Sequence, residues 1–150
     1  DVYKRQVKGD IVIELYADQA PANVNSFVFL AREGWYDGIS FFRVIPDFVA
    51  QAGDPTNSGV GHPGYQCTDE ITELGFDQAG VVGIANAGPN TGSSQFFITL
   101  APQSALSGRY TVIGQVVEGM DTLRSLSPRD PGDPNAAPGD MIETILIEER

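Results

Sequence analysis

The chain has 150 residues, of which 41% are hydrophobic and 19% are charged, and its formal net charge is −11 at pH 7. This length and balance suit one globular domain with a sizeable core, and no apolar run approaches the ~20 residues of a membrane helix. The acidity argues against nucleic acid and anionic membranes as partners, because both require a positively charged protein surface.

The chain opens with Asp1-Val2-Tyr3-Lys4-Arg5-Gln6 and lacks an initiator methionine. We interpret residues 1–8 as either an artefact or a truncated first strand, and residues 9–150 as a single domain. A cytoplasmic location is expected. Secretion and membrane anchoring stay open, because a truncated start leaves room for a lost targeting segment.

Two residue types that often carry chemistry occur once each, as Cys67 and His62. A single cysteine rules out an internal disulfide, and a His-rich or Cys-rich metal site lacks ligands. A Ser-His-Asp triad would depend on His62, and no nucleophile-elbow motif accompanies it. We therefore expect neither a metal nor another cofactor.

A strand and then a helix are predicted first along the chain. Residues 9–15 alternate with a period of two, which indicates a strand. Proline suits the first turn of a helix and glycine suits its C-terminal end, so a helix is predicted from Pro21 to just before Gly34. Its apolar residues recur every three or four positions and form one face for core packing, at Val24, Phe27, Val28 and Ala31.

Two short β-like runs follow, residues 41–45 and 48–52, separated by a proline-aspartate turn. Arg43 is the one cationic residue in the first run. Because side chains alternate along a strand, Arg43 is expected to share a face with Phe41 and Ile45. An unpaired buried charge is very costly, so Arg43 either reaches a surface groove or pairs with a carboxylate.

The middle of the chain holds two loops and two further strands. Residues 55–64 contain too much glycine for regular structure. Residues 81–85 and 96–100 predict strands on either side of a second loop rich in Gly, Pro and Asn.

The last third of the chain predicts two strands and a short helix. Residues 111–117 and 141–148 have the composition and alternation of strands, and residues 119–126 have helical spacing. Residues 101–110 and 127–139 predict loops. Seven or eight short strands and two helices favour a mainly β fold, a closed antiparallel barrel with the helices outside.

Two long segments, FFRVIPDFVAQAGD (residues 41–54) and ANAGPNTGSSQFFIT (residues 85–99), closely resemble the cyclophilin family of peptidyl-prolyl cis-trans isomerases. The likeness runs from about Gly9 to Ile147 in family order, and the short loops resemble bacterial members more than elaborated eukaryotic ones. The resemblance implies a closed eight-stranded antiparallel β-barrel capped by two α-helices. It also implies rotation about X-Pro peptide bonds, assistance to protein folding and no cofactor.

The same resemblance implies the residues of the site. Arg43 would stabilise the twisted amide, for which a permanently charged, multi-donor side chain is suited. Gln51 would contact substrate and help position Arg43, and the main chain of Asn86 would hold the substrate backbone. An apolar pocket for the proline ring would comprise Phe48, Val49, Phe97 and Leu106. The implied catalytic residues are Arg43, Phe48, Gln51, Asn86 and Phe97, and the implied substrate-binding residues are Val49, Ala85, Gln95, Leu106 and Tyr110.

The sequence departs from the common family pattern at several positions. Val49 stands where Met is frequent, Asp47 and Ala52 replace glycines, and Tyr110 replaces a His of many relatives. Ala105 stands where cyclosporin-sensitive relatives carry Trp. We therefore expect weak cyclosporin binding, because an aromatic surface and a hydrogen-bond donor are lost.

Three classes of function fit such a chain. An active isomerase would act, as a monomer, on proline-containing segments of unfolded or flexible proteins. A peptide-binding module would recognise such segments with little activity. The presence of both Arg43 and Gln51 favours the enzyme. A barrel that binds a small apolar ligand is disfavoured, because large inward candidates such as Phe27, Ile84 and Ile113 predict a filled interior.

Overall fold

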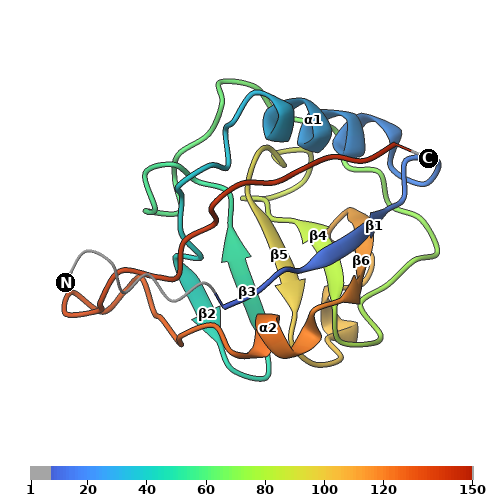
Figure 1. Ribbon diagram of the computed structural model, residues 1–150. Helices are drawn as coiled ribbons and strands as arrows, with labels where there is room; N and C mark the ends of the chain where they lie inside the picture. Colours follow the sequence, from blue (N-terminus) through green and yellow to red (C-terminus); the bar gives the residue numbers. More distant parts are fainter. Residues whose placement is uncertain (1–7, 150) are drawn as a thin grey trace.

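The structure, a computed structural model, describes residues 8–149 (Figure 1). The interpretation of residues 1–8 therefore falls, apart from Lys8, outside the described residues. Neither α-helix of this range has the length and hydropathy to cross a bilayer. The regular elements are β1 (Val12–Leu15), α1 (Pro21–Arg32), β2 (Arg43–Ile45), β3 (Val49–Ala52), β4 (Val81–Ile84), β5 (Phe96–Thr99), the 3-10 turn η1 (Ser104–Leu106), β6 (Val112–Glu118) and α2 (Met120–Arg124).

One antiparallel sheet contains all six strands, in the order β1-β6-β4-β5-β3-β2. Its register sets Arg43 opposite Gln51, Gln51 opposite Phe97, and Phe97 opposite Gly83. Residues that face one another across a sheet project to the same side. The register therefore places a cation, an amide and an aromatic ring in one row across three adjacent strands, and the row ends at a glycine.

The two faces of the sheet carry separate apolar clusters. One face contributes to the main core together with buried residues of α1 and α2, and it supplies Val44, Ala50, Ala52, Val82, Ile84, Phe96, Ile98 and Ile113. The opposite face carries a smaller buried cluster, formed by Val49, Phe76, Val81, Phe97 and Val112. The alternation of side chains along β3, β4 and β5 divides their residues between the clusters. We call the smaller group the outer cluster.

Both helices lie where the sequence predicts helices, and they lie at opposite ends of the sheet in Figure 1. The helix α1 buries Val24, Phe27 and Ala31 as expected, and also Leu30, whereas Val28 is half-buried. Gly34 follows it with a φ of 75°, a left-handed conformation that glycine adopts at little cost.

The sheet differs from the predicted closed, eight-stranded barrel. Within residues 8–149 six strands are formed, and β1 and β2 remain the edges of an open sheet. The predicted strand 141–148 makes one isolated bridge, between Met141 and Ser40. Ile142, Ile145 and Ile147 of this segment pack against the main core, whereas Leu146 is 83% exposed. The buried positions do not follow a period of two, so the alternation in this sequence predicted neither the side of the segment that is buried nor a continuous ladder of hydrogen bonds.

The first β-like run is also shorter than predicted. The strand β2 begins at Arg43, and Phe41 lies before it. The side chain of Phe41 packs in the main core with its ring 6.3 Å from that of Phe96. Phe41 therefore does not share the face of Arg43, because the alternation of a strand does not extend to it.

Candidate functional site

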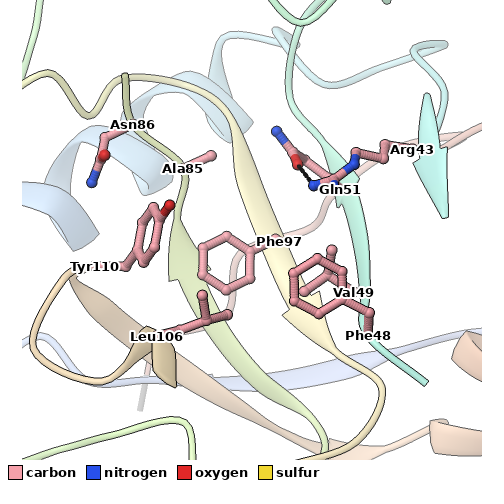
Figure 2. Close-up of a pocket in the computed structure, with 9 residues that line it drawn as sticks. All are labelled: Arg43, Phe48, Val49, Gln51, Ala85, Asn86, Phe97, Leu106 and Tyr110. Atoms are coloured by element: carbon pink, nitrogen blue, oxygen red, sulfur yellow. Dashed lines mark hydrogen bonds between the residues drawn. The ribbon is translucent and has the colours of Figure 1, made fainter. Parts of the chain in front are cut away.

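A surface depression of about 200 Å³ lies beside the outer cluster. Figure 2 shows its lining, with the rings of Tyr110, Phe97 and Phe48 in a row. Nine of the ten predicted site residues line it: Arg43, Phe48, Val49, Gln51, Ala85, Asn86, Phe97, Leu106 and Tyr110. The tenth, Gln95, lines an adjacent cavity of about 340 Å³, together with loop residues 59–62.

The floor of the depression is apolar and firmly packed. Val49 and Phe97 are 3% and 4% exposed, and they come from the paired strands β3 and β5. The Phe97 ring lies 5.2 Å from that of Phe76 and meets Tyr110 edge-on at 5.3 Å. These contacts fix the plane of the Phe97 ring, since aromatic pairs prefer tilted and edge-to-face arrangements at such distances.

Two supporting residues of the floor were not identified from sequence. Phe76 is fully buried in the outer cluster, next to Phe97. Gly83 faces Phe97 across the sheet, and a Cβ there would stand 2.7 Å from both the Phe97 and Phe76 rings. A glycine inside a strand pattern signals such a close approach, so Gly83 had a recognisable signal in the sequence. Phe76 had none beyond its hydrophobicity.

Arg43 reaches the groove and is half-buried there. Its guanidinium carbon lies 5.5 Å from the centroid of the Phe48 ring, and its Nη1 donates to Gln51 Oε1 at 3.4 Å. Among residues 8–149, the two ion pairs lie elsewhere. Of the two alternatives for Arg43, the structure therefore shows the surface groove, with no carboxylate partner in the described chain.

Polar side chains continue from Arg43 into the adjacent cavity. Gln51 Nε2 donates to Gln95 Oε1 at 3.0 Å, and Gln95 Nε2 donates to the carbonyl of Gly59 at 2.8 Å. On the other side of the depression, Asn86 Nδ2 donates to the carbonyl of Arg109 at 3.3 Å. The Asn86 side chain thus ties its own loop to the loop before β6.

The loop after β3 is organised around Asp54, a residue that the sequence alone did not single out. Its carboxylate is fully buried. Burial alone would raise the pKa of Asp54, but hydrogen bonds from the Thr56 hydroxyl and from the backbone N–H groups of Gly61, Thr56 and Gly59 lower it to about 2. Asp54 is therefore a carboxylate in the folded protein over the whole neutral range.

The described residues contain no group of three or more His, Cys, Asp or Glu side chains placed to hold a metal ion. The side chains of the depression suggest what it can bind. An apolar floor for a compact ring lies next to a cationic donor, and amide groups extend along the groove. Such a site can hold an apolar group and favour electron density that develops beside it.

Comparison with known proteins relates this arrangement to one family. The model of the family described as "Cyclophilin type peptidyl-prolyl cis-trans isomerase/CLD" matches residues 2–146. Peptidyl-prolyl cis-trans isomerase ppi1 of Schizosaccharomyces pombe is 46% identical over 145 residues, which cover 93% of this chain and 94% of that protein. Human peptidyl-prolyl cis-trans isomerase-like 1 is 46% identical over 124 residues, 80% of this chain and 75% of that protein.

Solved structures agree with these relatives. A crystal structure of a Cryptosporidium parvum cyclophilin type peptidyl-prolyl cis-trans isomerase superposes with a TM-score of 0.86 and 32% identity, covering 96% of this chain and 94% of that one. A second structure of that protein, determined in the presence of the dipeptide Ala-Pro, gives a TM-score of 0.85. The named relatives are eukaryotic, and the likeness to bacterial members stays a prediction. The chain belongs to the cyclophilin-type peptidyl-prolyl cis-trans isomerases.

Proposed function

We propose that this chain catalyses rotation about X-Pro peptide bonds in unfolded or flexible protein segments and so assists their folding. The barrier to rotation is ~18–20 kcal/mol, because the nitrogen lone pair is delocalised into the carbonyl. Catalysis requires groups that bind the twisted amide better than the planar one. The observation that carries the proposal is a guanidinium, unpaired with any carboxylate of residues 8–149, at the rim of an apolar depression.

Arg43 supplies the donor in this mechanism. Twisting the bond localises the lone pair on the proline nitrogen, and a guanidinium N–H can then donate to it. The half-buried position of Arg43 strengthens this interaction relative to bulk water. The hydrogen bond from Nη1 to Gln51 Oε1 restrains the plane of the guanidinium, so that its other donors stay aimed into the groove.

The proline ring occupies the apolar floor formed by Phe48, Val49, Phe97 and Leu106. Both polar ends of the Asn86 side chain are already bonded within the protein, which supports a role for its main chain in holding the substrate backbone. Ala85, Gln95 and Tyr110 contact residues that flank the proline. The relative crystallised in the presence of Ala-Pro makes an X-Pro dipeptide a suitable probe of this site.

The test is the cis-to-trans rate of an Ala-Pro-Phe peptide with wild-type protein and with Arg43→Ala at equal concentration. We expect the variant to lose about 100-fold in kcat/KM, the range found when one preorganised donor is removed. Arg124→Ala, which removes an exposed arginine of α2, should retain full activity.

Two results would overturn the proposal. A wild-type protein that binds the peptide without accelerating its isomerisation would be a recognition module. Acceleration that survives in Arg43→Ala would mean that the apolar floor performs most of the catalysis.

Weak cyclosporin binding is proposed on the same geometry. Ala105 lies exposed in η1, directly before the pocket residue Leu106, and offers neither a ring nor a side-chain donor. We expect Ala105→Trp to tighten inhibition by cyclosporin relative to wild type, measured as the inhibition constant in the same peptide assay. Sub-micromolar inhibition of the wild type would contradict the proposal.

A further inference from the structure

We propose that Asp54 is a positioning residue for Arg43, acting through loop residues 56–61 and the Gln95–Gln51 pair. The inference rests on the proposed function of Arg43. Asp54 lies in neither cavity lining, so it has no direct part in binding. Its influence follows from three linked sets of hydrogen bonds.

The first set fixes the loop around the buried carboxylate. Asp54 accepts from Thr56 N at 2.8 Å, Thr56 Oγ1 at 2.7 Å, Ser58 N at 3.1 Å, Gly59 N at 2.7 Å and Gly61 N at 3.0 Å. Among residues 8–149 no cation pairs with it. Because a buried charge must be satisfied, the loop adopts the one path that turns these donors inward. A Cβ on Gly61 would collide with the carboxylate, so the fit is close.

The second set passes through Gly59. Its N–H donates to Asp54 Oδ2 at 2.7 Å, and its carbonyl accepts from Gln95 Nε2 at 2.8 Å. The carboxylate and the glutamine thus hold the two backbone groups of one residue. Gly59 has a φ of 90°, a conformation that glycine adopts without strain. Release of the N–H would therefore let the carbonyl turn away from Gln95.

The third set links the orientation of the Gln95 amide to that of the Gln51 amide, and so to Arg43. Since Gln95 Nε2 faces the loop carbonyl, Gln95 Oε1 faces Gln51 Nε2, at 3.0 Å. Gln51 Oε1 then faces Arg43 Nη1, at 3.4 Å. If the loop carbonyl turned away, both amides could reverse, and the Gln51 NH₂ group would meet the guanidinium donor to donor. The loop thereby decides whether Arg43 has an acceptor that orients it.

The test begins with Asp54→Asn, which keeps the shape of the side chain. An asparagine offers one acceptor oxygen, and its NH₂ group would face the loop donors. We expect kcat to fall by about tenfold, within the ~100-fold that a 1 Å misplacement can cost, with KM changed less than kcat. The Gln51 side-chain amide signals should shift in the ¹⁵N–¹H NMR spectrum. The control is Asp133→Asn, because Asp133 is an exposed loop aspartate that accepts one backbone N–H. It should change neither kcat nor the Gln51 amide signals.

A double-mutant cycle separates positioning from mere support of the loop. In a Gln95→Ala background, Asp54→Asn should change kcat by less than twofold, because its route to Arg43 is already cut. Independent, multiplicative losses would overturn the proposal. So would unchanged kcat and unchanged Gln51 signals in a folded Asp54→Asn protein.

Two further arrangements keep the test decisive. Thermal denaturation shows whether Asp54→Asn is folded. If it is not folded, Thr56→Val is used in its place, since that variant removes one donor to Asp54 and keeps the shape of the side chain. If the wild type lacks isomerase activity, the proposed function fails. The Gln51 signals then still decide whether Asp54 controls the amides.

Discussion

Gly83 is the residue on which the position of the Phe97 ring depends. Its missing side chain leaves the space in which the Phe97 and Phe76 rings approach the strand β4. The position of the Phe97 ring in the pocket floor consequently depends on Gly83, although Gly83 does not itself line the depression.

Gly83→Ala should therefore move Phe97 toward the pocket. Overpacking of this kind costs about 1–3 kcal/mol, and the displaced ring should raise KM for the Ala-Pro-Phe peptide. The measurements are urea unfolding and peptide kinetics. Gly132→Ala, in the exposed loop after α2, is the control and should leave both unchanged. A Gly83→Ala protein with wild-type KM would show that the floor adjusts without cost to binding.

Single residues also show what the sequence could reveal about the site. Arg43, Gln51 and Phe97 belong to long, specific motifs, and the register places all three beside one depression. Asp54 ends the first of these motifs, yet its importance comes from backbone donors of the following loop. Backbone donors carry no side-chain signature, so the sequence could not identify the group that they surround.

At the scale of elements, α1 begins without a side-chain cap of its own. Its N-cap is Ala20, and the first-turn donors are satisfied by a residue distant in sequence. Glu70 accepts from Ala22 N at 3.2 Å and from Asn23 N at 2.7 Å. A carboxylate at this end of a helix also interacts favourably with the helix dipole. The helix and the loop that carries Glu70 are therefore coupled.

Glu70→Gln should destabilise the protein by about 1 kcal/mol, the usual contribution of a helix cap. The loss should appear as a lower midpoint of urea unfolding with an unchanged slope. Glu73→Gln, an exposed neighbour of the same charge, controls for the change in net charge. Equal midpoints for the two variants would argue against the cap.

Elements were predicted well where side-chain pattern and backbone pairing coincide. The helix α1 and the strands β3 to β6 lie within one or two residues of their predicted bounds. Residues 141–148 have a similar alternation, but only the three isoleucines pack on the main core, Leu146 is exposed, and one bridge joins the segment to Ser40. Strand pairing requires a partner strand that is remote in the sequence, and the hydrophobic pattern of one segment carries no information about that partner.

For the whole molecule, two hydrogen-bonded carboxylates, Asp54 and Asp140, contribute to the response of stability to acid. The pKa of Asp54 is about 2 in the folded protein, below its ordinary value of 3.8. A lowered folded-state pKa stabilises the protein fully above the ordinary value, and this contribution is lost as pH falls through the folded value. The pKa of Asp140 is lowered too, because hydrogen bonds from Ser127 and Lys8 outweigh its burial.

The free energy of unfolding should accordingly fall by about 2 kcal/mol on account of Asp54 between pH 4 and pH 2. Urea unfolding across this range measures it. Asp54→Asn should be less stable at pH 7 and should show a shallower decline in acid, since the titrating group is gone. Parallel curves for the two proteins would contradict the assignment.

The sequence predicts the fold class correctly, but not the number of strands or the closure of the sheet. Mainly β content, antiparallel pairing and two helices are observed, whereas closure and eight strands are not found within residues 8–149. Closure of a barrel depends on tilt and stagger between distant strands. These quantities are properties of the assembled sheet, and no single stretch of sequence specifies them.

The segment 140–149 crosses the molecule and approaches α1, where Arg32 Nη2 meets Glu149 Oε1 at 2.7 Å (Figure 1). Its isoleucines cover one side of the main core. During translation this segment emerges from the ribosome after every strand and both helices. Until these residues emerge, part of the apolar main core of the nascent chain is uncovered. A chaperone bound near the exit tunnel would shield this surface from aggregation during that interval.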